Sequence, residues 1–84
     1  MKKLAVYDST VKQFRTYENI DLNSVNEYCF VMITMNPNNY NAPCHGRALC
    51  TPRNIGFQII VDQNFGTLYA RGHNYAAWTD WKSI

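Results

Sequence analysis

Residues 55–84, IGFQIIVDQNFGTLYARGHNYAAWTDWKSI, decide the fold of this 84-residue chain. Within Phe57–Asp62 the side chains alternate with a period of two, which is typical of a strand with unequal faces. The segment Asp62–Gly66 interrupts this pattern and ends in a glycine, which adopts a positive φ without strain. Because Thr67–Arg71 is extended in character again, we predict an antiparallel hairpin with a bulged or longer turn.

The segments before this hairpin are also mainly of β character. The apolar run Cys29–Met35 is rich in β-branched residues and predicts a central strand, against which the hairpin should pair. A short N-terminal hairpin or one bent edge strand is expected from Leu4–Tyr7 and Val11–Tyr17. Asp21–Tyr28 predicts a short helix or a single 3₁₀ turn, with Asp21 as its N-cap.

The fold class that follows is mainly β, a small α+β domain. We expect an antiparallel sheet of three to five strands, with the C-terminal hairpin followed by a tail that carries both tryptophans, Trp78 and Trp81. The chain length allows one domain, and a chain this short has a thin stability margin.

The overall composition excludes several classes of protein. Apolar residues make up 46% of the chain and aromatic residues 14%, which argues against disorder. The formal net charge of +2 is small and its basic residues are scattered, so no nucleic-acid partner is expected. The apolar run after Met1 ends at Tyr7, too early for a signal peptide, and none is long enough to span a membrane.

The most irregular part of the sequence is residues 36–54, NPNNYNAPCHGRALCTPRN. It holds all three prolines and many asparagines, and long loops of this kind are often functional. A brief strand is possible at Ala48–Cys50.

The cysteines and histidines raise a metal hypothesis and an enzyme hypothesis. Zinc sites usually carry closely spaced ligand pairs, whereas Cys44 and His45 are adjacent and Cys50 and His73 are unpaired in sequence. A cysteine nucleophile needs a base within hydrogen-bond reach and a group that orients it, and no motif here supplies them. The carboxylates are spread singly as well. We therefore expect no metal, no cofactor and no enzymatic activity, and we expect Cys29 to be a small core residue.

The aromatic tail offers the best candidates for a binding face. Tyr69, Arg71, Trp78 and Trp81 could stack on sugar rings or anchor a partner protein. The alternative is that the tryptophans build the core of this small domain, with Arg71 stacked on one of them. The second interpretation is the stronger one for both tryptophans.

The tail resembles the C-terminal half of the pyocin knob domain, which recurs in phage tail fibres and in the fibres of R-type pyocins. The residues that carry the resemblance are Tyr69, Arg71, Asn74, Trp78, Trp81, Lys82 and Ile84. Upstream, Asp21–Asn23, Tyr28–Val31 and Asn41–Pro43 are similar to the opening, first strand and loop of the family. The chain departs from the family at Asn26-Glu27, where the family has Pro-Gly before its first strand.

The resemblance implies a non-enzymatic virion protein: a fibre knob or tip, or a head-fibre or decoration component. It implies an N-terminal attachment segment at residues 1–19, a knob-like domain at residues 20–84, and a homotrimer that assembles with other virion proteins. A host-surface glycan is a further possible partner, and the protein would be made in the host cytoplasm and act in the virion. The candidate partner-binding residues are Tyr40, Asn41, Arg47, Tyr69, Arg71 and His73. Two alternatives stay open: a phage-encoded inhibitor of a host enzyme, and a stand-alone carbohydrate-binding module.

Overall fold

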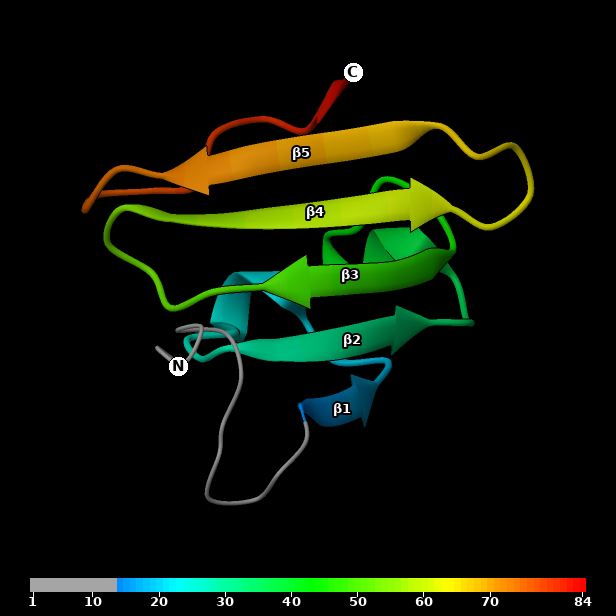
Figure 1. The fold of residues 1–84 in the computed structure, drawn as a ribbon, viewed down its shortest axis with the longest axis horizontal. Coiled ribbons are helices and arrows are strands. Elements are labelled where there is room, and N and C mark those ends of the chain that lie inside the picture. The colour runs from blue at the N-terminus through cyan, green and yellow to red at the C-terminus, as the bar shows by residue number, and fades with distance from the viewer. Residues whose placement is uncertain (1–13) are drawn as a thin grey trace, which may run out of the picture.

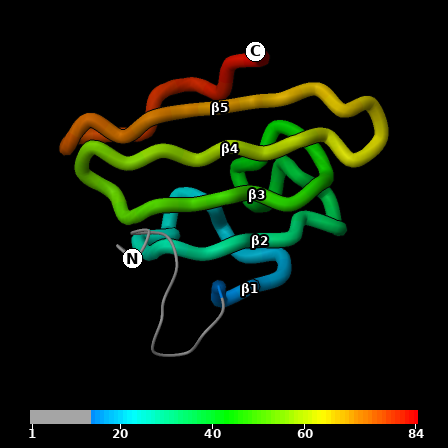
Figure 2. Tube along the Cα trace, in the orientation of Figure 1, coloured from blue at the N-terminus to red at the C-terminus, as the bar shows by residue number. Residues whose placement is uncertain are grey.

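The computed structural model describes residues 14–84, which form one six-stranded mixed sheet with two 3₁₀ turns (Figure 1). The strands are β1 (Arg15–Glu18), β2 (Cys29–Ile33), β3 (Gly46–Cys50), β4 (Gly56–Asp62), β5 (Leu68–His73) and β6 (Lys82–Ser83). Their order across the sheet follows the chain, so the colour in Figure 2 passes from blue at one edge to red at the other. The prediction of a mainly β fold is confirmed.

The predicted C-terminal hairpin is confirmed as β4 and β5, which pair antiparallel. The turn between them is built by Asp62, whose Oδ1 accepts hydrogen bonds from the backbone N–H groups of Asn64 at 2.8 Å and Phe65 at 3.3 Å. Gly66 completes the turn at a φ of 74°, a conformation that glycine adopts without cost. A carboxylate that caps local N–H groups followed by glycine is the chemistry that this turn needs.

The predicted position of the Cys29–Met35 strand was wrong. The segment does form β2, but β3 lies between β2 and the hairpin, and β4 pairs with β3. The intervening strand comes from the Asn/Pro-rich segment, where only Ala48–Cys50 was expected to be extended. Arg47 and Leu49 alternate with Ala48 and Cys50 on the two faces of β3, so a regular strand fits this short segment.

The predicted strand count of three to five and the wholly antiparallel pairing were also wrong. β1 pairs parallel with β2, because the chain crosses over between them through residues 19–28 instead of turning back in a hairpin. Asn19 ends β1 at a φ of 52°, and its side chain bonds the hydroxyl and the backbone N–H of Thr34. The sixth strand, β6, has only two residues, too few for a sequence pattern to reveal. The expected strand at Leu4–Tyr7 lies outside the described residues.

The two 3₁₀ turns lie in the loops on one side of the sheet. η1 (Leu22–Ser24) has the predicted cap: Oδ1 of Asp21 accepts a 2.9 Å hydrogen bond from the N–H of Asn23. η2 (Pro37–Tyr40) is capped in the same way by Asn36 and ends at Asn41 in the left-handed region. Of the two alternatives for Asp21–Tyr28, the 3₁₀ turn is therefore the correct one.

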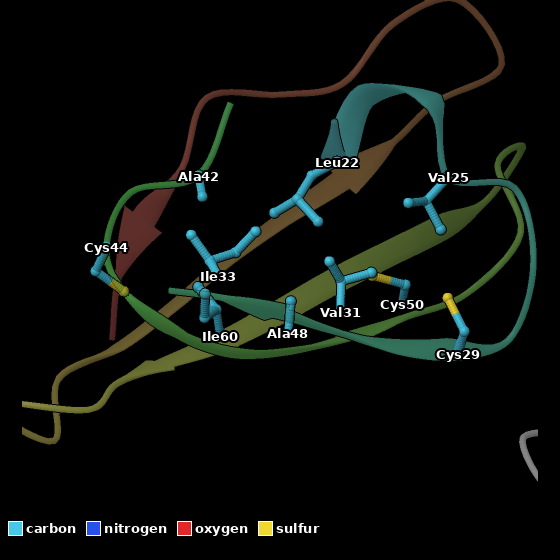
Figure 3. Close-up of a cluster of buried hydrophobic side chains, with 10 residues drawn as sticks. All are labelled: Leu22, Val25, Cys29, Val31, Ile33, Ala42, Cys44, Ala48, Cys50 and Ile60. Atoms are coloured by element: carbon cyan, nitrogen blue, oxygen red, sulfur yellow. The ribbon is translucent and has the colours of Figure 1, made fainter. Parts of the chain in front are cut away.

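The core occupies only one face of the sheet, which we call the covered face. Figure 3 shows its side chains gathered on the side of the sheet where η1 lies. Leu22 and Val25 of the η1 segment and Ala42 and Cys44 of the next loop close over it. The ten buried hydrophobic residues of the described chain are Leu22, Val25, Cys29, Val31, Ile33, Ala42, Cys44, Ala48, Cys50 and Ile60. Cys29 is fully buried, as predicted.

The opposite face, which we call the open face, is also apolar. Because η1, η2 and the tail after β5 lie on the covered face, the open face carries no layer from residues 14–84. Strand register places eight apolar side chains on it: Phe30, Met32, Leu49, Phe57, Ile59, Val61, Leu68 and Ala70. Phe14 adds an edge-to-face contact with Phe30, with ring centroids 4.8 Å apart. Phe57 and Val61 remain 41% and 45% exposed.

Candidate functional site

The centre of the candidate site is Arg71, a buried side chain on β5. Strand register places Arg71 directly opposite Gln58 on the covered face, and its Nε donates a 2.9 Å hydrogen bond to Oε1 of Gln58. The amide Nε2 of Gln58 in turn donates to the carbonyl oxygen of Leu22 at 2.8 Å. The guanidinium is thus bonded to the neighbouring strand of the sheet, and the same glutamine connects it to η1.

Both tryptophans pack on Arg71. Its guanidinium carbon lies 4.4 Å from the ring centroid of Trp78 and 4.6 Å from that of Trp81, so the cation is placed between two indoles. The imidazole of His73 meets Trp78 edge to face at 4.9 Å. Burial lowers the pKa of Arg71 to about 10. Cys50 and the charge of Asp21 act in the opposite direction and raise it, but their effect is smaller. The group therefore remains a cation at neutral pH.

The tail folds back over the covered face because its polar groups find backbone partners there. The indole N–H of Trp81 donates to the carbonyl oxygen of Asn41 at 2.9 Å, and that of Trp78 reaches the carbonyl oxygen of Asn23 at 3.5 Å. Oδ1 of Asn74 accepts from the N–H groups of Ala76 and Ala77, which turns the chain after β5. The tail therefore connects β5 to both 3₁₀ turns.

A groove of about 650 Å³ runs between this tail and the loops that carry the 3₁₀ turns. Polar and aromatic side chains line it, which is the composition of a recognition site more than of an apolar pocket. The lining residues are Asn23, Asn38, Asn41, Ala42, Arg53, Arg71, His73, Ala76, Ala77, Trp78, Thr79, Asp80 and Trp81.

Three of the six predicted partner-binding residues line the groove: Asn41, Arg71 and His73. The other three do not. Tyr40 packs against the core, with its hydroxyl 3.9 Å from Sδ of Met35, and Tyr69 also packs against the core. Arg47 lies on the open face, where its guanidinium contacts Sδ of Met32 at 2.9 Å. The predicted site is thus divided between the two sides of the sheet.

Sequence reasoning missed other polar residues of the groove, above all Arg53, Asn38 and Asp80. The asparagine-rich composition of residues 36–54 was the available signal, and it did indicate the correct loop. No local pattern connects Arg53 to Arg71, because only the tertiary fold brings the β3–β4 loop beside the tail. Asn23 was recognised as part of the predicted turn and of the stretch that resembles the opening of the knob family, but not as a groove residue.

The three cysteines are free, and all are buried. Burial, with a contribution from Asp62, raises the pKa of the Cys44 thiol to about 11, and a hydrogen bond with Cys29 together with burial raises the pKa of Cys50. Cys44 and Cys50 are therefore poor nucleophiles at neutral pH. The hydrogen bond with Cys50 lowers the pKa of Cys29, which is fully buried. No group of three or more His, Cys, Asp or Glu side chains within residues 14–84 is arranged to hold a metal ion.

The part of the chain that the structure describes contains no helix with the length and hydropathy of a membrane span.

Comparison of the chain with protein-family models, with curated proteins and with solved structures found no match.

Proposed function

We propose that this chain is a non-enzymatic structural protein of a phage virion, a fibre knob or tip or a head-fibre or decoration component, which assembles as a homotrimer. The observation that carries the proposal is the open face. Within residues 14–84 one face of the sheet is covered and the other is apolar and carries no layer, which is half of a layered structure, and in this proposal another copy supplies the second layer.

The open face is continuous across the sheet. One row joins Phe30, Leu49, Ile59 and Ala70 on four neighbouring strands, and a second row runs beside it from Met32 to Leu68. Charged side chains on this face are few: Glu18 and Lys82 lie at its margins and Arg47 within it. Depletion of charge at the centre of an apolar patch is typical of the core of a protein–protein interface.

The size of the open face suits self-association. Four strands about 4.8 Å apart and about five residues long give an apolar face on the order of 300 Å². That is comparable to the largest apolar patch of a typical monomer, and such patches are often interaction sites. A cyclic trimer would turn the open faces of three copies toward a common axis. Burial of Phe57 and Val61 there removes the most exposed apolar side chains of the face from water.

The resemblance of residues 20–84 to the pyocin knob domain supports a virion role over the other assignments. An inhibitor of a host enzyme would also need a binding surface, but it would be absent from purified particles. Mass spectrometry of washed phage particles distinguishes the two: we expect peptides of this chain at a stoichiometry of many copies per particle. Absence from the particles, together with co-purification with a host protein, would contradict the proposal.

Sedimentation analysis of the purified chain tests the assembly. We expect wild type to sediment as a trimer and Ile59→Lys, which places a charge in the centre of the open face, to sediment as a monomer that retains its β-sheet circular dichroism. Asn39→Lys, on an exposed residue of η2, is the matched control and should remain trimeric. A wild-type monomer at high concentration would refute the proposed assembly.

A further inference from the structure

The groove on the covered face contains a buried positive charge that makes no ion pair in the described part of the chain. Arg71 is only 8% exposed, and among residues 14–84 its Nη2 has no hydrogen-bond partner, although the charge of Asp21 acts on the guanidinium from a longer range. Within residues 14–84 Arg71 forms no ion pair, and Gln58, the acceptor for its Nε, is neutral. A buried guanidinium without a carboxylate partner is unusual, because the desolvation of a charge is costly unless the charge is paired.

Other charged groups make the groove positive as a whole. Arg53, an exposed side chain in the middle of the β3–β4 loop, lines the same groove as Arg71. His73 lies beside Trp78, and its Nδ1 accepts a 3.1 Å hydrogen bond from the backbone N–H of Asn54. Asp80 is the one carboxylate among the described lining residues, so basic groups outnumber it. A groove with this balance attracts an anion.

The walls of the groove carry groups that suit hydroxyl-rich ligands. The side-chain amides of Asn23 and Asn38 make no hydrogen bond within the described part of the chain and line the groove. An amide both donates and accepts, which matches a sugar hydroxyl that does the same. Trp78 and Trp81 add apolar surface at the same place. These features together favour a saccharide over a simple inorganic anion.

We propose that this groove binds an acidic saccharide, a sugar chain whose residues carry carboxylates. The carboxylate lies against the positive end formed by Arg53 and Arg71, and the sugar hydroxyls bond to the asparagine amides. The volume of about 650 Å³ is within the range of small-ligand sites. This inference rests on the proposed virion function, since it names the surface chemistry that an attachment protein would contact.

A glycan array probed with the full-length chain tests the proposal. The array carries oligosaccharides that contain glucuronate, galacturonate or sialate, the methyl esters of the same sugars, and poly(glycerol phosphate). We expect binding to carboxylated sugars and at least tenfold weaker binding to their esters, which differ only in the charge. Equal binding to acid and ester, a preference for the phosphate polymer, or no signal would each overturn the proposal.

Two arginine variants locate the site. Arg53→Ala should weaken binding about tenfold without unfolding the protein, because the one hydrogen bond that Arg53 makes in the described chain uses its backbone N–H. Arg47→Ala, on the open face, is the matched control and should leave binding unchanged. Equal losses in both variants, or none in either, would place the ligand elsewhere. Binding should also weaken as salt is raised from 50 to 500 mM, since screening acts on exposed charges such as Arg53.

The test of saccharide binding and the test for the chain in washed particles can give different answers. A chain that is present in washed particles but binds no acidic saccharide would overturn this inference and leave the virion role standing. A chain that binds acidic saccharides but is absent from particles would do the reverse.

Discussion

Arg71 and Gln58 face each other across the β4–β5 hairpin, and the Nε of Arg71 donates a 2.9 Å hydrogen bond to Oε1 of Gln58. Gln58 is fully buried and uses its other polar atom, Nε2, to bind the carbonyl oxygen of Leu22. One neutral amide therefore satisfies the sheet-side donor of a buried cation and fixes η1 above the sheet. The groove depends on this side chain, although Gln58 does not line it.

Gln58→Met should destabilise the protein strongly. Methionine has a similar shape but leaves Nε of Arg71 and the carbonyl oxygen of Leu22 without partners, and loss of buried partners, one of them charged, costs about 2–4 kcal/mol. Urea unfolding followed by tryptophan fluorescence measures the loss. Gln63→Met, at an exposed position after β4, is the matched control and should change the free energy of unfolding by less than about 0.5 kcal/mol. Equal effects of the two substitutions would contradict the role assigned to Gln58.

The period of the β4 segment predicted a strand but not which of its faces would be covered. Gln58 and Ile60 are the buried residues, whereas Phe57, Ile59 and Val61 lie on the open face. Amphipathicity alone would favour the reverse assignment, because the second set is the more apolar. The covered face is the one on which the 3₁₀ turns and the tail lie and on which Arg71 pairs with Gln58, and the period of a single strand does not reveal these tertiary contacts.

The candidate site was predictable in part. Tryptophans in so small a domain were expected to be structural, with Arg71 stacked on one of them, and the contacts of both rings with Arg71 agree with this expectation. The position of Arg47 on the far side of the sheet was not predictable, since it depends on the register of β3 against β2 and β4. Successive side chains of a strand point to opposite faces of the sheet. A shift of the strand register by one residue would therefore exchange the side chains on the two faces.

Removal of the indole N–H of Trp81 should lower the free energy of unfolding more than removal of that of Trp78. Trp81→Phe deletes a 2.9 Å hydrogen bond to Asn41 and reduces the stacking on Arg71, so we expect a loss of about 2 kcal/mol. Trp78→Phe also reduces the stacking on Arg71, but the hydrogen bond that it deletes is a weak one, a 3.5 Å contact with the carbonyl oxygen of Asn23, so it should cost less, about 1 kcal/mol. Urea unfolding of the two variants in parallel, followed by far-ultraviolet circular dichroism, gives the order. A larger loss for Trp78→Phe would contradict this assignment.

Stability should fall in alkaline solution because of Cys44. Burial raises the pKa of this thiol to about 11 in the folded protein, above its value near 9 in the unfolded chain. The folded state thus holds the proton more tightly, so the contribution is complete below pH 9 and is lost as the pH rises toward 11. At pH 10.5 the loss relative to pH 8 should be about 2 kcal/mol from this residue.

The control for the alkaline effect is Cys44→Ala, which has no thiol to titrate at this position. Its free energy of unfolding should drop less between pH 8 and pH 10.5 than that of wild type, by about the same 2 kcal/mol. The residual drop in the variant includes the part due to Cys50, whose pKa is also raised. Identical pH dependence of the variant and wild type would show that the Cys44 thiol is not held in its protonated form by the fold.

Gly56→Ala should be among the most damaging substitutions in the chain. A Cβ at Gly56 would lie 1.9 Å from the carbonyl oxygen of Pro52, so the start of β4 would have to separate from the loop that carries Arg53 into the groove. Backbone atoms cannot move aside as a flexible side chain does, and we expect a loss of at least about 2 kcal/mol. Gly72→Ala is the matched control on the neighbouring strand, where the nearest atom to an added Cβ lies 3.7 Å away. Urea unfolding that ranks Gly72→Ala as the more destabilising change would contradict the close approach at Gly56.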